Sequence, residues 1–135
     1  MELHIKIIGY ILIVLAFLHL IFPWYFKWKK DLGNIILINR QMMYVHTFFI
    51  ALVVLLGGLL CVTSSKELIE TRLGGRLAFG MFIFWGFRLI IQFVGYTSQT
   101  WKGKRFETTV HILFSILWLY LTLVFLIIFW VNKSL

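Results

Sequence analysis

The sequence predicts an all-α integral membrane protein, built as an antiparallel bundle of four transmembrane helices in a single domain over residues 1–135. Three observations predict this fold. Of the 135 residues, 61% are hydrophobic and 13% are charged, whereas about a quarter are charged in soluble domains. The mean hydropathy is +0.95, and a soluble domain this small exposes too much of itself to hide so much apolar surface. The apolar residues are also gathered in four long stretches with short connections between them.

Each of these stretches is long enough to cross a bilayer as a helix, which takes about 20 residues. The predicted spans are roughly 4–22, 41–62, 76–96 and 107–131. We expect the first to be retained and not cleaved as a signal peptide. A signal peptide has a basic N-terminal region and a cleavage site of small residues. Here Lys6 is the only basic residue at the start of the span, and an aromatic run begins at Pro23 where the cleavage site would be needed.

The connections between the spans have the composition of membrane-surface segments. "PWYFKWKKD" combines three aromatic residues of an interfacial belt with three lysines outside it: Trp24, Tyr25, Trp28, Lys27, Lys29 and Lys30. "SSKELIETRLGG" predicts a short interfacial helix between spans 2 and 3, with Ser64 and Glu67 at capping-box spacing and Gly74-Gly75 at its end. "TSQTWKGKRF" predicts a polar turn before span 4.

The distribution of basic residues predicts how the chain is oriented in the membrane. Seven lie in loops 1–2 and 3–4 (Lys27, Lys29, Lys30, Arg40, Lys102, Lys104, Arg105), and five lie on the other side (Lys6, Lys66, Arg72, Arg76, Lys133). The positive-inside rule therefore places loops 1–2 and 3–4 in the cytoplasm. The net charge of +8 is spread along a membrane surface and not gathered on a polar domain, so the sequence predicts lipid as its partner and no nucleic acid.

Five strongly polar residues lie inside the spans: His19, His46, Arg88, Gln92 and His111. Four antiparallel spans put the end of spans 1 and 3 and the start of spans 2 and 4 on one side. At 1.5 Å per residue, the three histidines and Gln92 then lie about 5–8 Å inside that boundary, and Arg88 lies about one turn deeper. Because intramembrane ionisable groups are costly and mark functional cavities, we predict that they form one site.

Helical spacing gives each of these residues a stripe that contains small or polar residues, which favour helix–helix contact over lipid contact. The stripes are Gly9, Leu12, Ala16, His19 and Pro23; Asn39, Met43, His46, Ile50, Val53 and Gly57; Gly80, Phe84, Arg88, Gln92 and Gly95; and Glu107, His111, Ser115, Trp118 and Thr122. The histidines are therefore predicted to face the bundle interior.

Haem b is the first ligand that this pattern predicts. Two imidazoles from different helices can hold the iron axially, and the pair would be His46 with either His111 or His19. The third histidine would then contact a substrate or a quinone. Four glycines would make room for the porphyrin and three arginines would meet its propionates: Gly57, Gly80, Gly86, Gly95, Arg40, Arg88 and Arg105.

A bare transition metal ion is the second. Three histidines (His19, His46 and His111) with an open position suit zinc, copper or iron. Glu107, four residues before His111, would then act as a base or orient that histidine. Glu107 is also one candidate counter-charge for Arg88, and an anionic ligand is the other.

Two readings need no metal. In the first, a quinone, a lipid or another hydrophobic anion is bound by Arg88, Gln92, Arg40 and the histidines. In the second, the polar residues specify helix packing in a structural subunit of a larger complex or in a homo-oligomer. Transport by this chain alone is disfavoured because broken helices and paired repeats are absent from the sequence. The leading prediction is redox chemistry at a haem or metal site, by a membrane oxidoreductase or an electron carrier.

Overall fold

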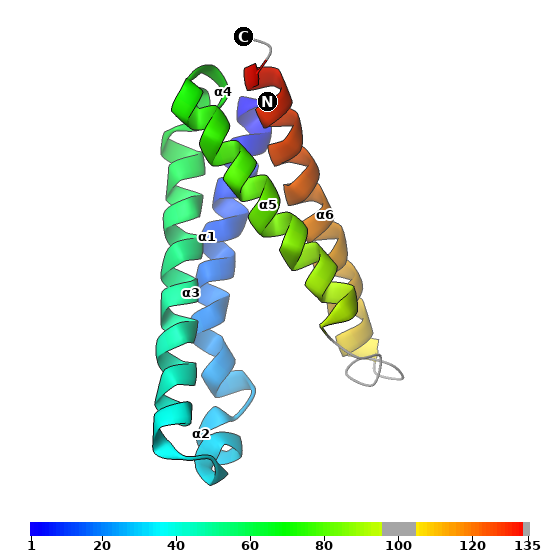
Figure 1. Cartoon of the computed structure of the whole chain (residues 1–135). Coiled ribbons are helices and arrows are strands. Elements are labelled where there is room, and N and C mark those ends of the chain that lie inside the picture. The colour runs from blue at the N-terminus through cyan, green and yellow to red at the C-terminus, as the bar shows by residue number, and fades with distance from the viewer. Residues whose placement is uncertain (96–104, 134–135) are drawn as a thin grey trace. The chain divides into compact units, whose positions relative to one another are not determined.

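The computed structural model describes residues 1–95 and 105–133, and all of the regular structure in these ranges is helical (Figure 1). Four helices are long and apolar enough to cross a membrane: α1 (Glu2–Tyr25), α3 (Leu37–Thr63), α5 (Arg72–Val94) and α6 (Arg105–Lys133). Each contains one of the predicted spans, except that α5 ends at Val94, two residues before the predicted end. The prediction of an all-helical chain with four candidate spans is confirmed, and it is compatible with an integral multi-pass membrane protein.

Shorter elements join these helices. They are α2 (Trp28–Asp31), the 3-10 helix η1 (Leu32–Asn34) and α4 (Ser65–Glu70). Helix α3 begins at Leu37, four residues before the predicted span, and Arg40 N donates to Ile36 O over 3.2 Å. Most of the predicted polar turn before span 4, including Lys102 and Lys104, lies outside the described residues.

The junction of α4 and α5 differs from the prediction. Thr71 has extended backbone angles and caps α5, its side chain accepting a hydrogen bond from Gly74 N at 2.9 Å. Gly74 and Gly75 therefore lie in the first turn of α5, and the prediction that they end the preceding helix was wrong. Their role is steric, because a Cβ atom on Gly74 would overlap the backbone of Glu67 and Leu68.

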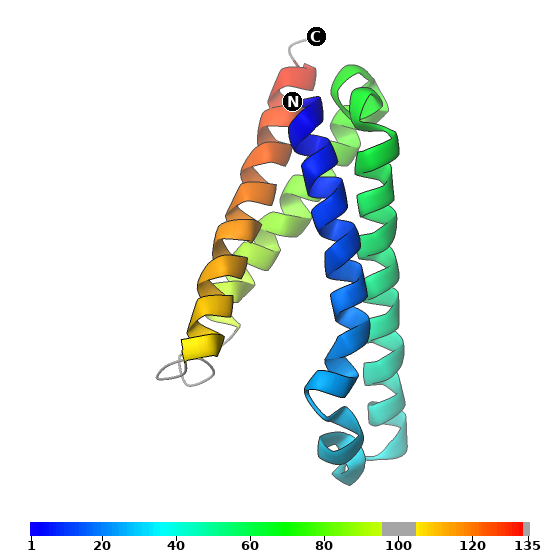
Figure 2. The same cartoon turned by 180° about the vertical axis from the view of Figure 1, so that it is seen from behind.

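The chain forms two compact units, and the first comprises residues 3–65. In it α1 and α3 lie side by side (Figures 1 and 2) and are in close contact at two glycines. A Cβ atom on Gly9 would lie 2.8 Å from Gly58 O, and one on Gly58 would lie 3.0 Å from Cγ1 of Ile13. Small residues thus let the two backbones meet, as they do between membrane helices generally.

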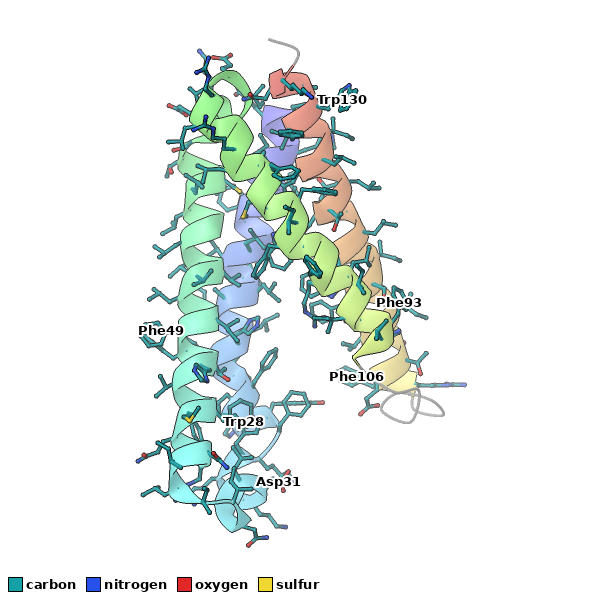
Figure 3. The ribbon with its side chains drawn as sticks, viewed as in Figure 1. Trp28, Asp31, Phe49, Phe93, Phe106 and Trp130 are labelled. Carbon is teal, nitrogen blue, oxygen red and sulfur yellow. The ribbon has the colours of Figure 1, made fainter. Side chains whose placement is uncertain are left out.

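This close approach sets the rotation of α3. Its buried residues are Ala51, Val54, Gly58 and Cys61. The predicted stripe through His46 is not the one that packs on α1, since Ile50 and Val53 on that stripe are 49% and 57% exposed, so its place in the bundle interior stays a prediction. Phe49 also points away from α1 (Figure 3). On α1 the prediction holds, since Gly9, Leu12 and Ala16 are buried.

The second unit comprises residues 66–135 with Met1 and Glu2. Helices α5 and α6 contact each other along their lengths. Near the start of α5, Phe79 meets Phe129 at a centroid distance of 4.9 Å. Near its end, Phe93 meets His111 at 5.8 Å.

The side chain of Asn132, near the end of α6, connects α6 to α4 by hydrogen bonds. Its Nδ2 donates to the backbone oxygens of Leu68, Ile69 and Thr71 at 3.3, 2.8 and 2.6 Å. The last carbonyls of a helix have no partner within the helix, so Asn132 acts as a capping group for α4 from a distant part of the chain. Nothing in the sequence pattern pointed to this role.

Candidate functional site: the polar cluster of α5 and α6

The buried side chain of Gln92 is the centre of a polar cluster in the second unit. Its Oε1 accepts hydrogen bonds from Arg88 Nη1 at 3.2 Å and from Trp118 Nε1 at 3.3 Å. Its Nε2 lies 3.1 Å from Nδ1 of His111 and donates to the backbone oxygen of His111 at 3.3 Å. An amide offers two acceptor sites and two donors, so all four are used. We call Arg88, Gln92, His111 and Trp118 the polar cluster.

These contacts assign the tautomer of His111. Arg88 and Trp118 can only donate, so the atom of Gln92 that faces them must be the oxygen, and the atom that faces His111 must be the amide nitrogen. The amide nitrogen has no lone pair to offer, so Nδ1 of His111 is the acceptor. The ring proton of His111 is therefore on Nε2, which makes this nitrogen a donor.

Arg88 is half-buried, and its guanidinium is held by an oxygen and an aromatic face. The Cζ atom lies 4.9 Å from the centroid of the Trp118 ring, within the range of a cation–π contact, which is worth about 0.5–2 kcal/mol. The same Trp118 stacks on Trp85, with centroids 5.2 Å apart and planes 9° apart. Trp118 thus supports the cation and connects it to the buried middle of the helix pair.

Helical spacing explains how the sequence builds this cluster. Trp85, Arg88 and Gln92 recur every three or four residues on α5, and so do His111, Ser115, Trp118 and Thr122 on α6. Trp85, Gln92, Trp118 and Thr122 are buried. The predicted stripe of α6 is therefore confirmed from His111 to Thr122. Of the predicted stripe of α5, Arg88 and Gln92 lie at the contact with α6, whereas Phe84 is 50% exposed.

The hydroxyl groups on the same face are satisfied locally. Ser115 Oγ donates to the backbone oxygen of His111 and Thr122 Oγ1 to that of Trp118, each at 2.7 Å. This back-bonding to the residue four positions earlier is the usual arrangement of Ser and Thr inside helices. The two hydroxyls complete the polar face without needing partners on another helix.

Trp85 is the residue of this region that sequence reasoning missed. Its side chain is 4% exposed, and its Nε1 is the one buried side-chain nitrogen or oxygen of the described residues that has no hydrogen-bond partner. Leaving a buried donor unsatisfied costs about 1–3 kcal/mol. A tryptophan in an apolar run gives no sequence signal of this kind, because only the packing decides where its N–H points.

The other predicted site residues are placed as follows. His19 and Arg40 are half-buried on α1 and α3, and His46 and Glu107 are exposed on α3 and α6. Nδ1 of His19 lies 2.8 Å from the backbone oxygen of Leu15; since a carbonyl only accepts, Nδ1 carries the proton and Nε2 the lone pair. His19, His46 and Arg40 belong to the first unit and the polar cluster to the second, so the single site uniting them stays a prediction. Within residues 1–95 and 105–133, no group of three or more His, Cys, Asp or Glu side chains is arranged to hold a metal ion.

No protein-family model matches this chain, and searches of curated proteins and of solved structures found no significant match either.

Proposed function

We propose that this chain is a multi-pass membrane protein whose polar cluster binds a hydrophobic ligand through a hydrogen-bond-accepting end, such as the carboxylate of a lipid or the carbonyl of a quinone. The observation that carries the proposal is a buried, unsatisfied donor next to a cation. The Trp85 N–H is buried without a partner among the described residues, and the cation of Arg88 lies on the same face three residues further on.

The chemistry of these donors favours an organic acceptor over a metal at this position. A metal ion needs the lone pair of an imidazole nitrogen. Nδ1 of His111 already uses its lone pair on Gln92, and Nε2 carries the proton in the assigned tautomer. At this position we therefore favour a quinone or lipid-like anion over a haem or metal bound by His111, which the sequence predicted first.

A titration of the full-length protein in mild detergent tests this proposal, with oleate and decylubiquinone as the probes. Arg88→Gln removes the cation, and Arg76→Gln removes an exposed cation from the same helix as the matched control. Because hydrogen bonds to charged groups are worth about 1.5–3 kcal/mol, Arg88→Gln should weaken the probe that binds by roughly 10- to 100-fold. The control should change affinity less than about twofold.

Absence of saturable binding by both probes would defeat the ligand-binding proposal. So would equal weakening in the two variants. The cluster would then be a packing device, as expected of a structural subunit in a larger membrane complex or a homo-oligomer.

A haem b or bare metal site at His19 is the second candidate, and one observation favours it. Metal-bound histidines characteristically donate their other ring N–H to a carboxylate, a backbone carbonyl or water, and His19 makes such a contact with Leu15 O. His46, in the same unit, is the candidate for a second ligand. An oxidised and dithionite-reduced optical spectrum, with zinc, copper and iron analysis of the same sample, tests it. His19→Ala should remove the Soret band or the metal, and His4→Ala on the same helix is the control.

The membrane arrangement belongs to the proposal as well. We infer four antiparallel spans, with α4 at the interface and loops 1–2 and 3–4 in the cytoplasm. In a Cys61→Ser background, Asn34→Cys should be labelled by an impermeant maleimide only from the cytoplasmic side and Lys66→Cys only from the opposite side. Labelling of both from one side would exclude this arrangement.

A further inference from the structure

A second feature of the first unit lies at the end of α1 and begins four residues after His19. A hollow of about 480 Å³ is lined by Pro23, Trp24, Tyr25, Lys27, Lys29 and Lys30. This volume lies within the roughly 300–1,000 Å³ of small-molecule sites. Three of the six lining residues are cationic and two carry aromatic rings.

The backbone builds this hollow by a reversal at Lys27. Helix α1 ends at Tyr25, and Lys27 has φ 54° and ψ 47°, in the left-handed region. It is the one residue other than glycine with a positive φ in residues 1–95 and 105–133. Its backbone oxygen then accepts from Lys30 N and Asp31 N at 3.1 and 3.0 Å, which closes α2.

A lysine is an unexpected residue for this conformation. The left-handed region costs a residue with a Cβ atom about 1–2 kcal/mol, and glycine would avoid that cost. Such outliers justify a hypothesis of function when the surroundings hold them in place. Here the reversal brings the side chains of Lys27, Lys29 and Lys30 to the hollow beside Trp24 and Tyr25.

The position and charge of the hollow indicate its ligand. The segment 23–36 contains three lysines and a single acid, Asp31 on α2 (Figure 3), and Asp31 does not line the hollow. Trp24 is 80% exposed and Tyr25 is 50% exposed, at the end of a helix long enough to span a bilayer. Exposed aromatic rings and lysines in this position meet phospholipid headgroups.

We propose that this hollow binds a phosphate group, carried by an anionic phospholipid headgroup or free in solution. The lysines neutralise the phosphate oxygens as point charges. Trp24 and Tyr25 supply the apolar wall against which the glycerol part of a headgroup lies. Trp28 of α2 contacts Tyr44 of α3, with ring centroids 5.4 Å apart, and this contact connects the lysine segment to the helix that follows it.

Binding to the full-length protein in neutral micelles tests the proposal with three probes: dihexanoyl phosphatidylglycerol, inorganic phosphate, and the diacylglycerol of the same chain length, which has no phosphate. The variant is Lys27→Gln/Lys29→Gln/Lys30→Gln. Its matched control, Lys66→Gln/Arg72→Gln/Lys133→Gln, removes the same charge from exposed positions of the second unit. We expect at least tenfold weaker phosphatidylglycerol binding in the variant, less than a twofold change in the control, and no saturable binding of diacylglycerol.

The replacement Lys27→Arg/Lys29→Arg/Lys30→Arg keeps the charge and should keep the affinity, which separates lost binding from lost folding. Competition by millimolar phosphate would identify a site for free phosphate, and phosphatidylglycerol binding without such competition would identify a headgroup site. Equal weakening in the two glutamine variants, or diacylglycerol binding as tight as phosphatidylglycerol binding, would overturn the proposal.

Discussion

Nε2 of Gln92 on α5 and Nδ1 of His111 on α6 lie 3.1 Å apart, and this contact decides what His111 can do. It makes Nδ1 an acceptor and leaves the ring proton on Nε2, so neither ring nitrogen of His111 has a lone pair for a metal ion. In His19 the Nδ1 proton is given to Leu15 O at 2.8 Å, so the lone pair is on Nε2. Two histidines that are equivalent in the sequence are thus opposite in chemistry.

Gln92→Leu should destabilise the protein by about 1–3 kcal/mol. Single side-chain hydrogen bonds between membrane helices average about 0.6 kcal/mol, but this change removes four contacts at once and leaves Trp118 Nε1 and Arg88 without their oxygen. The free energy of unfolding in mixed micelles, measured by titration with SDS, gives the value. Gln41→Leu, at an exposed position of α3, is the control and should change it by less than about 0.5 kcal/mol.

Gly58→Ala should cost about 1–3 kcal/mol, because an added methyl group in a tight contact forces the two backbones apart. Its Cβ would lie 2.8 Å from Gly9 O on α1. Gly80→Ala is the matched control, since no other group of the described residues lies within 4 Å of a Cβ there. It should be neutral or stabilise α5 by up to about 1 kcal/mol. If both substitutions cost the same in SDS unfolding, the close approach of α1 and α3 is not what limits stability.

The four helices were predictable because hydropathy over about 20 residues identifies a span without any knowledge of its neighbours. The rotation of α3 about its own axis, which decides the residues that contact α1, was not predictable in this way. Polarity selected the stripe through His46, whereas the structure packs the stripe through Ala51, Val54 and Gly58. Gly57 and Gly58 are adjacent, and the sequence cannot tell which of them meets Gly9, although a shift of one residue turns the helix by about 100°.

Within the candidate site, the sequence identified Arg88, Gln92 and His111 because charged and amide groups inside a span need partners. It did not identify Asn132 or the orphaned N–H of Trp85, because these roles arise from packing between segments far apart in the chain. Asn132 reaches carbonyls more than 60 positions earlier. No local pattern encodes such a contact.

Asn132→Ala should loosen the short helix α4 more than the rest of the chain. The substitution leaves the backbone oxygens of Ile69 and Thr71 without the side-chain donor, at a cost of about 1–2 kcal/mol. Amide hydrogen exchange should therefore rise in residues 65–71 and stay unchanged in α1. Asn39→Ala, at an exposed position of α3, should leave both regions as they are. Uniform exchange across α4 and α1 in the Asn132 variant would refute its capping role.

Trp85→Phe and Trp118→Phe separate the role of each indole N–H, because the two rings stack on each other and lose similar area. Trp118 Nε1 is hydrogen-bonded to Gln92, whereas Trp85 Nε1 has no partner among the described residues. Trp118→Phe should therefore destabilise the ligand-free protein by about 1–2 kcal/mol more than Trp85→Phe does, measured by SDS unfolding. For binding of oleate or decylubiquinone the order should reverse, since Trp85 keeps an N–H available to the ligand. An affinity unchanged by Trp85→Phe would remove this tryptophan from the proposed site and leave its buried N–H as a cost of packing alone.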